Sequence, residues 1–197
     1  LWVFKDTLGG QPNCTIQYSD GYIYTGFWNS ETKDANFVCV SATDEDPDNP
    51  TETKYATWTY AVQGGFYWAG AYVTDKYAIV GSDDGESDST SDSSYVYCFD
   101  KLTGEVVQKV GPHHGDIRSD ISYYDGRIYF TSKGGYLYSY NLKEDGTIDT
   151  ENLIEPIEIG KMSTSTPAIA NGRCYVGSSY GSNFSGTYGI SVVDINE

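Results

Sequence analysis

The chain has 197 residues, enough for one domain with a buried core, and its 39% hydrophobic and 20% charged residues exclude a disordered composition. The net charge of −16 and the lack of basic clusters exclude binding to the phosphate backbone of nucleic acids. The apolar runs are too short to span a bilayer, so membrane insertion is not expected.

One turn-strand unit occurs four times along the chain. It reads D-G-Y-I-Y-T-G from Asp20, D-K-Y-A-I-V-G from Asp75, D-G-R-I-Y-F-T from Asp125 and N-G-R-C-Y-V-G from Asn171. The second residues of these turns lie 55, 50 and 46 residues apart. A period of this length without a helical pattern is typical of a β-propeller blade.

Each unit predicts four strands, a to d, and no helix. Strand a is expected at 15–18, 71–74, 121–124 and 167–170, and strand b at 22–25, 77–80, 127–131 and 173–177. Strand c is expected at 37–41, 95–99, 136–140 and 190–193, and strand d at 56–61, 105–110 and 154–159. The chain is therefore one all-β propeller domain over 1–197, with units near 11–61, 66–110, 116–160 and 163–197 and an outer strand at 1–5.

A β-sandwich is the alternative fold, because sandwiches also have short, regularly spaced strands. Repetition of one turn-strand unit in register favours the propeller, in which stacked blades cover each other's faces.

The four cysteines are widely separated and form no zinc pattern. Three disulfide connectivities are open on paper. Cys39, Cys98 and Cys174 lie inside predicted strands, where buried free thiols are the favoured interpretation, and the state of Cys14 is left open with them.

Tyr95–Val107, Y-V-Y-C-F-D-K-L-T-G-E-V-V, reads as a strand c, a Thr-Gly turn and a strand d, and Ser165–Ser178 reads as an a–b hairpin. Both segments resemble the PQQ-like (quinoprotein-type) β-propeller repeat. L-W-V-F-K at the N-terminus and Ala56–Tyr60 look like its Trp-bearing outer strand, in which Gln108 replaces the Trp of the second unit. Among relatives, bacterial surface proteins of unknown role look nearest, which implies an extracellular or cell-surface location.

The resemblance brings no catalytic residue to this chain. Quinone-dependent alcohol dehydrogenases of the family have eight blades and an adjacent cysteine pair, and neither is present here. Pyrroloquinoline quinone or calcium is conceivable as a cofactor, but no matching ligand motif supports either.

Four units are fewer than the usual six to eight blades. The favoured interpretation is a part of a larger propeller, because the chain opens on L-W-V-F-K and stops before the last strand d. Two alternatives are a four-bladed ring, closed by Leu1–Lys5 as the missing strand d, and a homodimer of two half-propellers.

The d-to-a and b-to-c loops are expected to gather on one face, which makes their unusual residues candidates for ligand binding. Phe66, Tyr67 and Trp68 follow two glycines, and Trp28 lies in a b-to-c loop. Exposed aromatic rings stack on sugars or on partner side chains, whereas packing between blades is the alternative.

The next d-to-a loop, Gly111–Asp120, holds the only histidines, His113 and His114, and also Asp116 and Arg118. These types suit acid-base chemistry or a metal, although a hydrogen-bonded loop is the favoured interpretation. The acidic runs 44–52 and 82–92 are similar to calcium loops but miss the twelve-residue pattern, so solvated surface loops are expected.

The sequence thus predicts a non-catalytic extracellular propeller that binds a protein or a carbohydrate on its d-a/b-c loop face. The alternatives are a fragment of a PQQ-dependent oxidoreductase and a purely architectural repeat.

Overall fold

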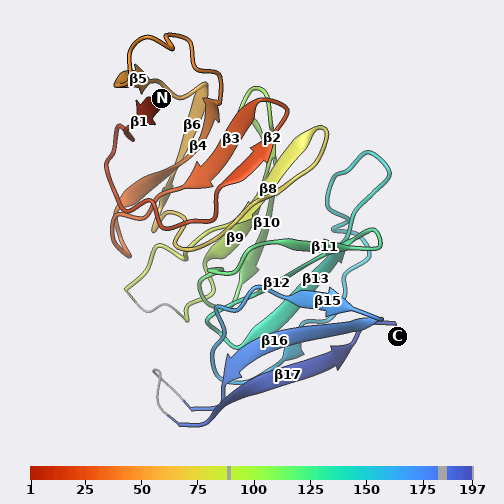
Figure 1. The fold of residues 1–197 in the computed structure, drawn as a ribbon. Coiled ribbons are helices and arrows are strands. Elements are labelled where there is room, and N and C mark those ends of the chain that lie inside the picture. Colours follow the sequence, from red (N-terminus) through yellow and green to blue (C-terminus); the bar gives the residue numbers. More distant parts are fainter. Residues whose placement is uncertain (88–89, 182–185, 197) are drawn as a thin grey trace.

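The computed structural model describes residues 1–87, 90–181 and 186–196, and within them the chain is all-β without a helix. Four antiparallel sheets follow one another in chain order from one end of the molecule to the other (Figure 1). The first sheet contains β2 (Gln17–Ser19), β3 (Tyr22–Gly26), β4 (Asp34–Ser41) and β6 (Trp58–Gln63), and the second contains β7 (Tyr72–Val73), β8 (Tyr77–Gly81), β9 (Ser94–Asp100) and β10 (Val106–His113).

The third sheet contains β11 (Ser122–Tyr124), β12 (Arg127–Thr131), β13 (Tyr136–Asn141) and β14 (Ile157–Glu158). The fourth has three strands, β15 (Ala168–Ala170), β16 (Arg173–Ser179) and β17 (Tyr188–Asp194). The four sheets are the blades predicted from the repeat, and the last of them has three strands among the described residues.

The repeated turn has a physical cause in the backbone. Asp20, Asp125 and Asn171 adopt φ values of 50°, 48° and 52°, and a glycine at positive φ follows each of them. Two successive positive φ angles define the type I′ turn, whose twist matches that of a two-stranded hairpin, and Asp-Gly and Asn-Gly pairs adopt it most easily. The repeated dipeptide therefore sets the register of strand b against strand a in three blades.

The core lies between the blades. Tyr24, Phe37 and Trp58 of the first blade pack against Tyr97 and Phe99 of the second. A second cluster joins the second blade to the third, and a third cluster joins the third blade to the fourth. Each blade is thus stabilised by the apolar face of its neighbour, as expected for a radial stack.

The N-terminal strand lies at the opposite end of the molecule from the fourth blade (Figure 1). β1 (Trp2–Phe4) pairs in parallel with β5 (Glu52–Lys54), and Trp2 and Phe4 pack on the outer face of the first blade. Leu1–Lys5 therefore does not complete the fourth blade of a closed four-bladed ring, because this segment is bound to the first blade.

In the first two blades, strand d docks on the following blade through one side chain. Trp58 donates its Nε1–H to the carbonyl of Lys101 at 2.9 Å. Gln108 stands in the same register as Trp58, opposite Cys98 as Trp58 is opposite Cys39. Its amide exchanges two hydrogen bonds with the backbone of Ile148, 2.9 Å and 2.7 Å long. The prediction that Gln108 occupies the Trp position is confirmed.

All four cysteines are buried free thiols. Cys39, Cys98 and Cys174 lie in β4, β9 and β16, as predicted, and burial raises the pKa of Cys14 and of Cys98 to about 12. Among the described residues, no helix is long and apolar enough to cross a membrane.

Candidate ligand-binding loop face

Loops from different blades meet at one end of the sheets. Arg118, in the connection from the second blade to the third, contacts Glu31 in the b-to-c loop of the first blade and Asp83 in the b-to-c loop of the second. Residues 87 positions apart in sequence therefore lie within 3.2 Å of each other. The contacts agree with the expectation that d-to-a and b-to-c loops share one face.

Three aromatic rings form a stack on this face. The ring centroids of Trp28 and Tyr67 are 4.5 Å apart, and those of Tyr67 and Trp68 are 4.2 Å apart, with interplanar angles of 27° and 21°. The Arg118 guanidinium carbon lies 4.6 Å from the centre of the Tyr67 ring. We call Trp28, Tyr67 and Trp68 the aromatic stack. A stacked pair stabilises the fold by about 1 kcal/mol beyond the area it buries.

Trp68 is held in an unusual position. Its φ is 62°, in the left-handed region, and its side chain is 40% exposed. Such a backbone conformation costs a bulky residue about 1–3 kcal/mol and persists where the surroundings impose it, most often at functional sites. Trp68 thus has a strained backbone and an accessible ring, and it lies at one end of the aromatic stack.

Two of the candidate residues lie in the core and offer no surface to a ligand. Phe66 is fully buried and packs against Phe37 at a centroid distance of 5.3 Å. His113 is 2% exposed, donates to or accepts from the Tyr140 hydroxyl at 2.9 Å, and meets the rings of Phe130 and Tyr138 edge-on. Burial lowers the pKa of His113 to about 4, so the ring is neutral at pH 7.

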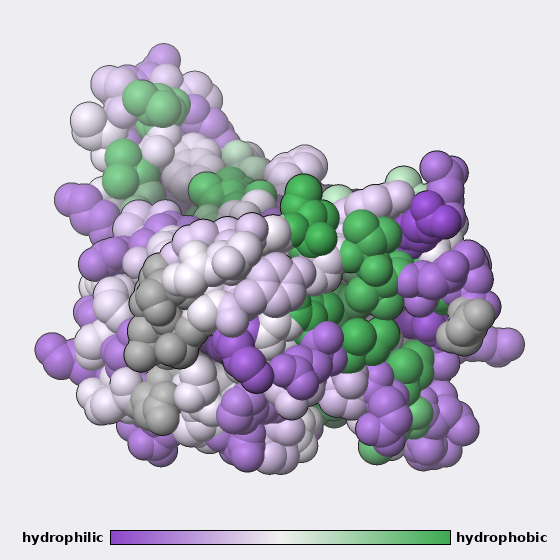
Figure 2. All heavy atoms as spheres, turned by 90° about the horizontal axis from the view of Figure 1, so that it is seen from below, coloured by the Kyte–Doolittle hydropathy of each residue, from purple (hydrophilic) through white to green (hydrophobic). Residues whose placement is uncertain are grey.

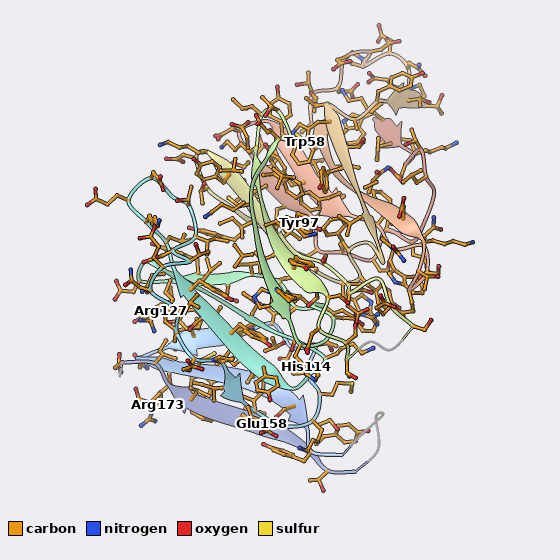
Figure 3. The ribbon with its side chains drawn as sticks, turned by 180° about the vertical axis from the view of Figure 1, so that it is seen from behind. Trp58, Tyr97, His114, Arg127, Glu158 and Arg173 are labelled. Carbon is orange, nitrogen blue, oxygen red and sulfur yellow. The ribbon has the colours of Figure 1, made fainter. Side chains whose placement is uncertain are left out.

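His114 lies on the loop face but contacts other residues than the aromatic stack. Its Nδ1 is 2.6 Å from the Asp92 carboxylate, and its ring meets Tyr136 of the third blade edge-on. Figure 3 labels His114 near the loop end of the strands, whereas Arg127 and Arg173, which follow the a–b turns of the third and fourth blades, lie toward the opposite edge of these blades. The two adjacent histidines thus lie in different environments, because His113 points into the core and His114 points outward.

Arg118 lies at the centre of a buried ionic cluster. One guanidinium nitrogen, Nη2, is 3.0 Å from Glu31, 2.7 Å from Asp83 and 2.8 Å from Asp116, and Lys133 Nζ is 3.6 Å from Asp116. Asp83 and Asp116 are at most 1% exposed, and Arg118 is 5% exposed. We call Glu31, Asp83, Asp116, Arg118 and Lys133 the ionic cluster.

Burial dominates the electrostatics of this cluster. It raises the pKa of Asp116 to about 7, against the opposing effect of Arg118, and it raises the pKa of Asp83 well above its ordinary value, with the neighbouring Asp116 as the second cause. Burial is the largest single effect on the pKa of Arg118 and lowers it, but Asp83, Asp116 and Glu31 together outweigh burial and raise this pKa above its ordinary value. The guanidinium is therefore the permanent charge that holds the cluster together.

The three carboxylates are spaced as they would be around a metal ion, since their oxygen atoms lie within 4.8 Å of one another. The Arg118 nitrogen lies among these oxygens and takes the place that a cation would use. The cluster as it stands is an arginine site, in which the planar guanidinium binds carboxylates from three loops.

The expectation of solvated acidic loops is wrong for the start of the second run. Asp83 and Asp84 are 1% and 6% exposed, Asp83 binds Arg118, and Asp84 accepts from the Glu86 backbone and the Ser91 hydroxyl. Residues 88–89 of this run lie outside the described residues. In the first run, Glu52 accepts two backbone N–H groups and Lys54 pairs with Glu45, so its carboxylates make bonds within the insert.

Sequence reasoning missed Glu31, which lies in no motif, and placed Asp83 only in an acidic run expected to be solvated. Their partner Arg118 is far away in sequence. One signal was available: Arg118 follows a carboxylate in a d-to-a loop expected to meet the b-to-c loops on one face, and a buried arginine needs carboxylate partners.

Comparison with known proteins supports the fold. No family model matches the chain, and no curated protein matches its sequence. The computationally designed Ika4 protein superposes with a TM-score of 0.66 at 12% identity, over 100% of this chain and 98% of the designed one. BamB from Moraxella catarrhalis superposes with a TM-score of 0.56 at 14% identity, over 98% of this chain.

A second designed protein, Ika8, superposes with a TM-score of 0.59 at 11% identity over 90% of this chain. The chain spans only 45% of the length of both BamB and Ika8. These neighbours are β-propellers, and BamB has the PQQ-like type, so the propeller prediction is confirmed. Identities of this size establish the fold alone.

Proposed function

We propose that the protein is a β-propeller binding module that holds a carbohydrate against the aromatic stack on its loop face. The observation that carries this proposal is Trp68, a 40% exposed ring at φ 62° stacked on Tyr67. A sugar presents an apolar face of C–H groups to such a ring, and rigid aromatic side chains lose little conformational entropy on binding.

The surroundings of the stack favour a neutral, polar ligand. The ionic cluster beside it contains three carboxylates against two cations, and the chain as a whole carries a net charge of −16. An anionic ligand would be repelled at long range, whereas a neutral sugar meets no such barrier. A protein ligand with an exposed aromatic or arginine anchor is the alternative for the same surface.

The test is a titration of tryptophan fluorescence and binding heat with a panel of neutral oligosaccharides. Trp68→Ala is expected to weaken binding by about 2 kcal/mol, roughly thirtyfold, because it removes the accessible ring. Tyr55→Ala is the matched control, since Tyr55 is an aromatic residue 84% exposed in the connection before β6.

Thermal unfolding of both variants checks that the fold is retained. Equal affinity of Trp68→Ala and the parent chain would contradict the proposed site. Saturable quenching by pyrroloquinoline quinone with calcium, and none by any sugar, would instead support the quinone-dependent alternative.

The extracellular or cell-surface location that the family resemblance implies remains a prediction of its own. Accessibility of the protein on intact cells to a membrane-impermeant label tests it, and labelling only after lysis would contradict it.

A further inference from the structure

Strand c of the fourth blade exposes an apolar position that is buried in every other blade. Phe37, Val96, Leu137 and Ile190 each lie opposite the fifth residue of strand b in their own blade. The first three are 0%, 0% and 3% exposed because the next blade covers them, whereas Ile190 is 71% exposed.

Neighbouring positions of the same face repeat the pattern. The third residue of strand b is Tyr24, Ile79 and Tyr129 in the first three blades, at most 3% exposed, and Tyr175 in the fourth, 36% exposed. Val192, opposite Tyr175, is 55% exposed. Figure 2, which views the molecule from the side where β17 lies, shows a band of apolar residues. The fourth blade has the surface of an inner blade and not of a solvated end.

The same blade has an open edge. In the first three blades strand c pairs with strand d, but β17 pairs only with β16 among the described strands. An uncovered strand edge of seven residues presents backbone N–H and C=O groups to another chain.

The opposite end of the molecule has the complementary feature. Trp2 donates its Nε1–H to the carbonyl of Ala42 at 3.3 Å, as Trp58 does to the carbonyl of Lys101. Ala42 and Lys101 are equivalent, since each is the first residue after strand c of its blade. β1 thus docks on the first blade as the strand d of a preceding blade, and it has no strand c beside it: its one partner among the described strands is β5.

We propose that a second copy of this chain covers the fourth blade and supplies its missing strand. β1 of each copy would pair with β17 of the other, and the first blade of each would cover Tyr175, Ile190 and Val192 of the other. A two-fold axis then relates the two junctions, and the dimer closes as a ring of eight blades, four from each copy.

Two facts favour a second copy over another occupant. The two ends of one chain are complementary, so the same pair of surfaces satisfies both junctions without a further protein. The chain length also fits two copies in one ring, because this chain covers only 45% of the propellers BamB and Ika8. It covers 98% of Ika4, a designed protein of the same length.

The experiment is the solution mass of the chain by light scattering over a wide concentration range. The expected mass is twice the 21.7 kDa of one chain. Ile190→Lys is expected to give a folded monomer, because this side chain is 71% exposed in one copy and its charge would be buried only in the dimer. Leu102→Lys is the control, since Leu102 is 63% exposed in the turn that follows β9 and is expected to leave the dimer intact.

Hydrogen exchange provides a second readout, in which the backbone amides of β17 are expected to be slow in the parent chain and fast in Ile190→Lys. A monomer at every concentration would overturn the proposal and would leave the face to a segment or protein outside this chain. Open-ended association would overturn it too, as would a dimer that Ile190→Lys leaves unchanged.

Discussion

At the scale of single residues, the two adjacent histidines show how position decides chemistry. His113 is enclosed by Phe130, Tyr138 and Tyr140, and burial lowers its pKa to about 4. An unfolded histidine has a pKa near 6.5. Between these two values the unfolded chain binds the proton that the folded chain refuses, so this residue makes the protein less stable as the pH falls.

Replacement of His113 by Gln tests this effect through the free energy of unfolding at a series of pH values. Relative to the variant, the parent chain is expected to lose about 3 kcal/mol as the pH falls from about 6.5 to 4. The raised pKa of Asp116 has the opposite sign, since it lowers stability as the pH rises toward 7. It acts in both proteins and cancels in the difference. Parallel curves for the two proteins would contradict the assignment.

At the scale of strands, the first two blades are each fastened to the next by the side chain that strand d places on the following c–d connection. Trp58 uses one hydrogen bond and a large apolar surface, with its ring against Phe99. Gln108 uses two hydrogen bonds to the fully buried Ile148 and needs no aromatic ring. A polar side chain therefore fills, in the second blade, the position that Trp58 fills in the first (Figure 3 shows Trp58 beside the second blade).

Gln108→Leu keeps the size of this side chain and removes both hydrogen bonds. We expect the free energy of unfolding to fall by about 2 kcal/mol, because the Ile148 N–H and C=O groups lose their partners in a buried place. Chemical denaturation measures the loss. Gln17→Leu, on β2 of the first blade, is the control and is expected to change stability little; an equal loss in both variants would contradict the docking role.

At the scale of the whole molecule, the ionic cluster ties three loops from separate parts of the chain. Arg118 holds Glu31 of the first blade and Asp83 of the second from the connection that leads to the third. Because the guanidinium is the centre of this contact, it fixes how neighbouring blades sit around the loop face and supports the position of Tyr67, over which it lies.

Arg118→Met is expected to cost about 3–5 kcal/mol of unfolding free energy, since it leaves buried carboxylates unpaired. Without the guanidinium their folded pKa values lie further above those of the unfolded chain, so the variant loses stability as the pH rises. The deficit measured by denaturation should therefore be smaller at pH 5 than at pH 8. Arg127→Met is the control, because Arg127 bonds to the neutral amide of Asn141. A deficit independent of pH would contradict this account.

The sequence by itself determined the local elements. Asp-Gly and Asn-Gly turns impose one backbone geometry, so the a–b hairpins and their spacing follow from the order of the residues. The position of Gln108 in the Trp register follows for the same reason, because strand pairing keeps a fixed period.

Tertiary structure decided everything that depends on which residues meet across blades. The sequence placed Phe66 and Trp68 in one loop, but only packing buried the first and exposed the second. It placed Asp83 in an acidic run expected to be solvated, yet an arginine 35 residues away removes it from water. The same holds for the N-terminal strand, which binds the first blade and not the fourth, because the energy of burying Trp2 and Phe4 depends on surfaces that exist only once the blades have stacked.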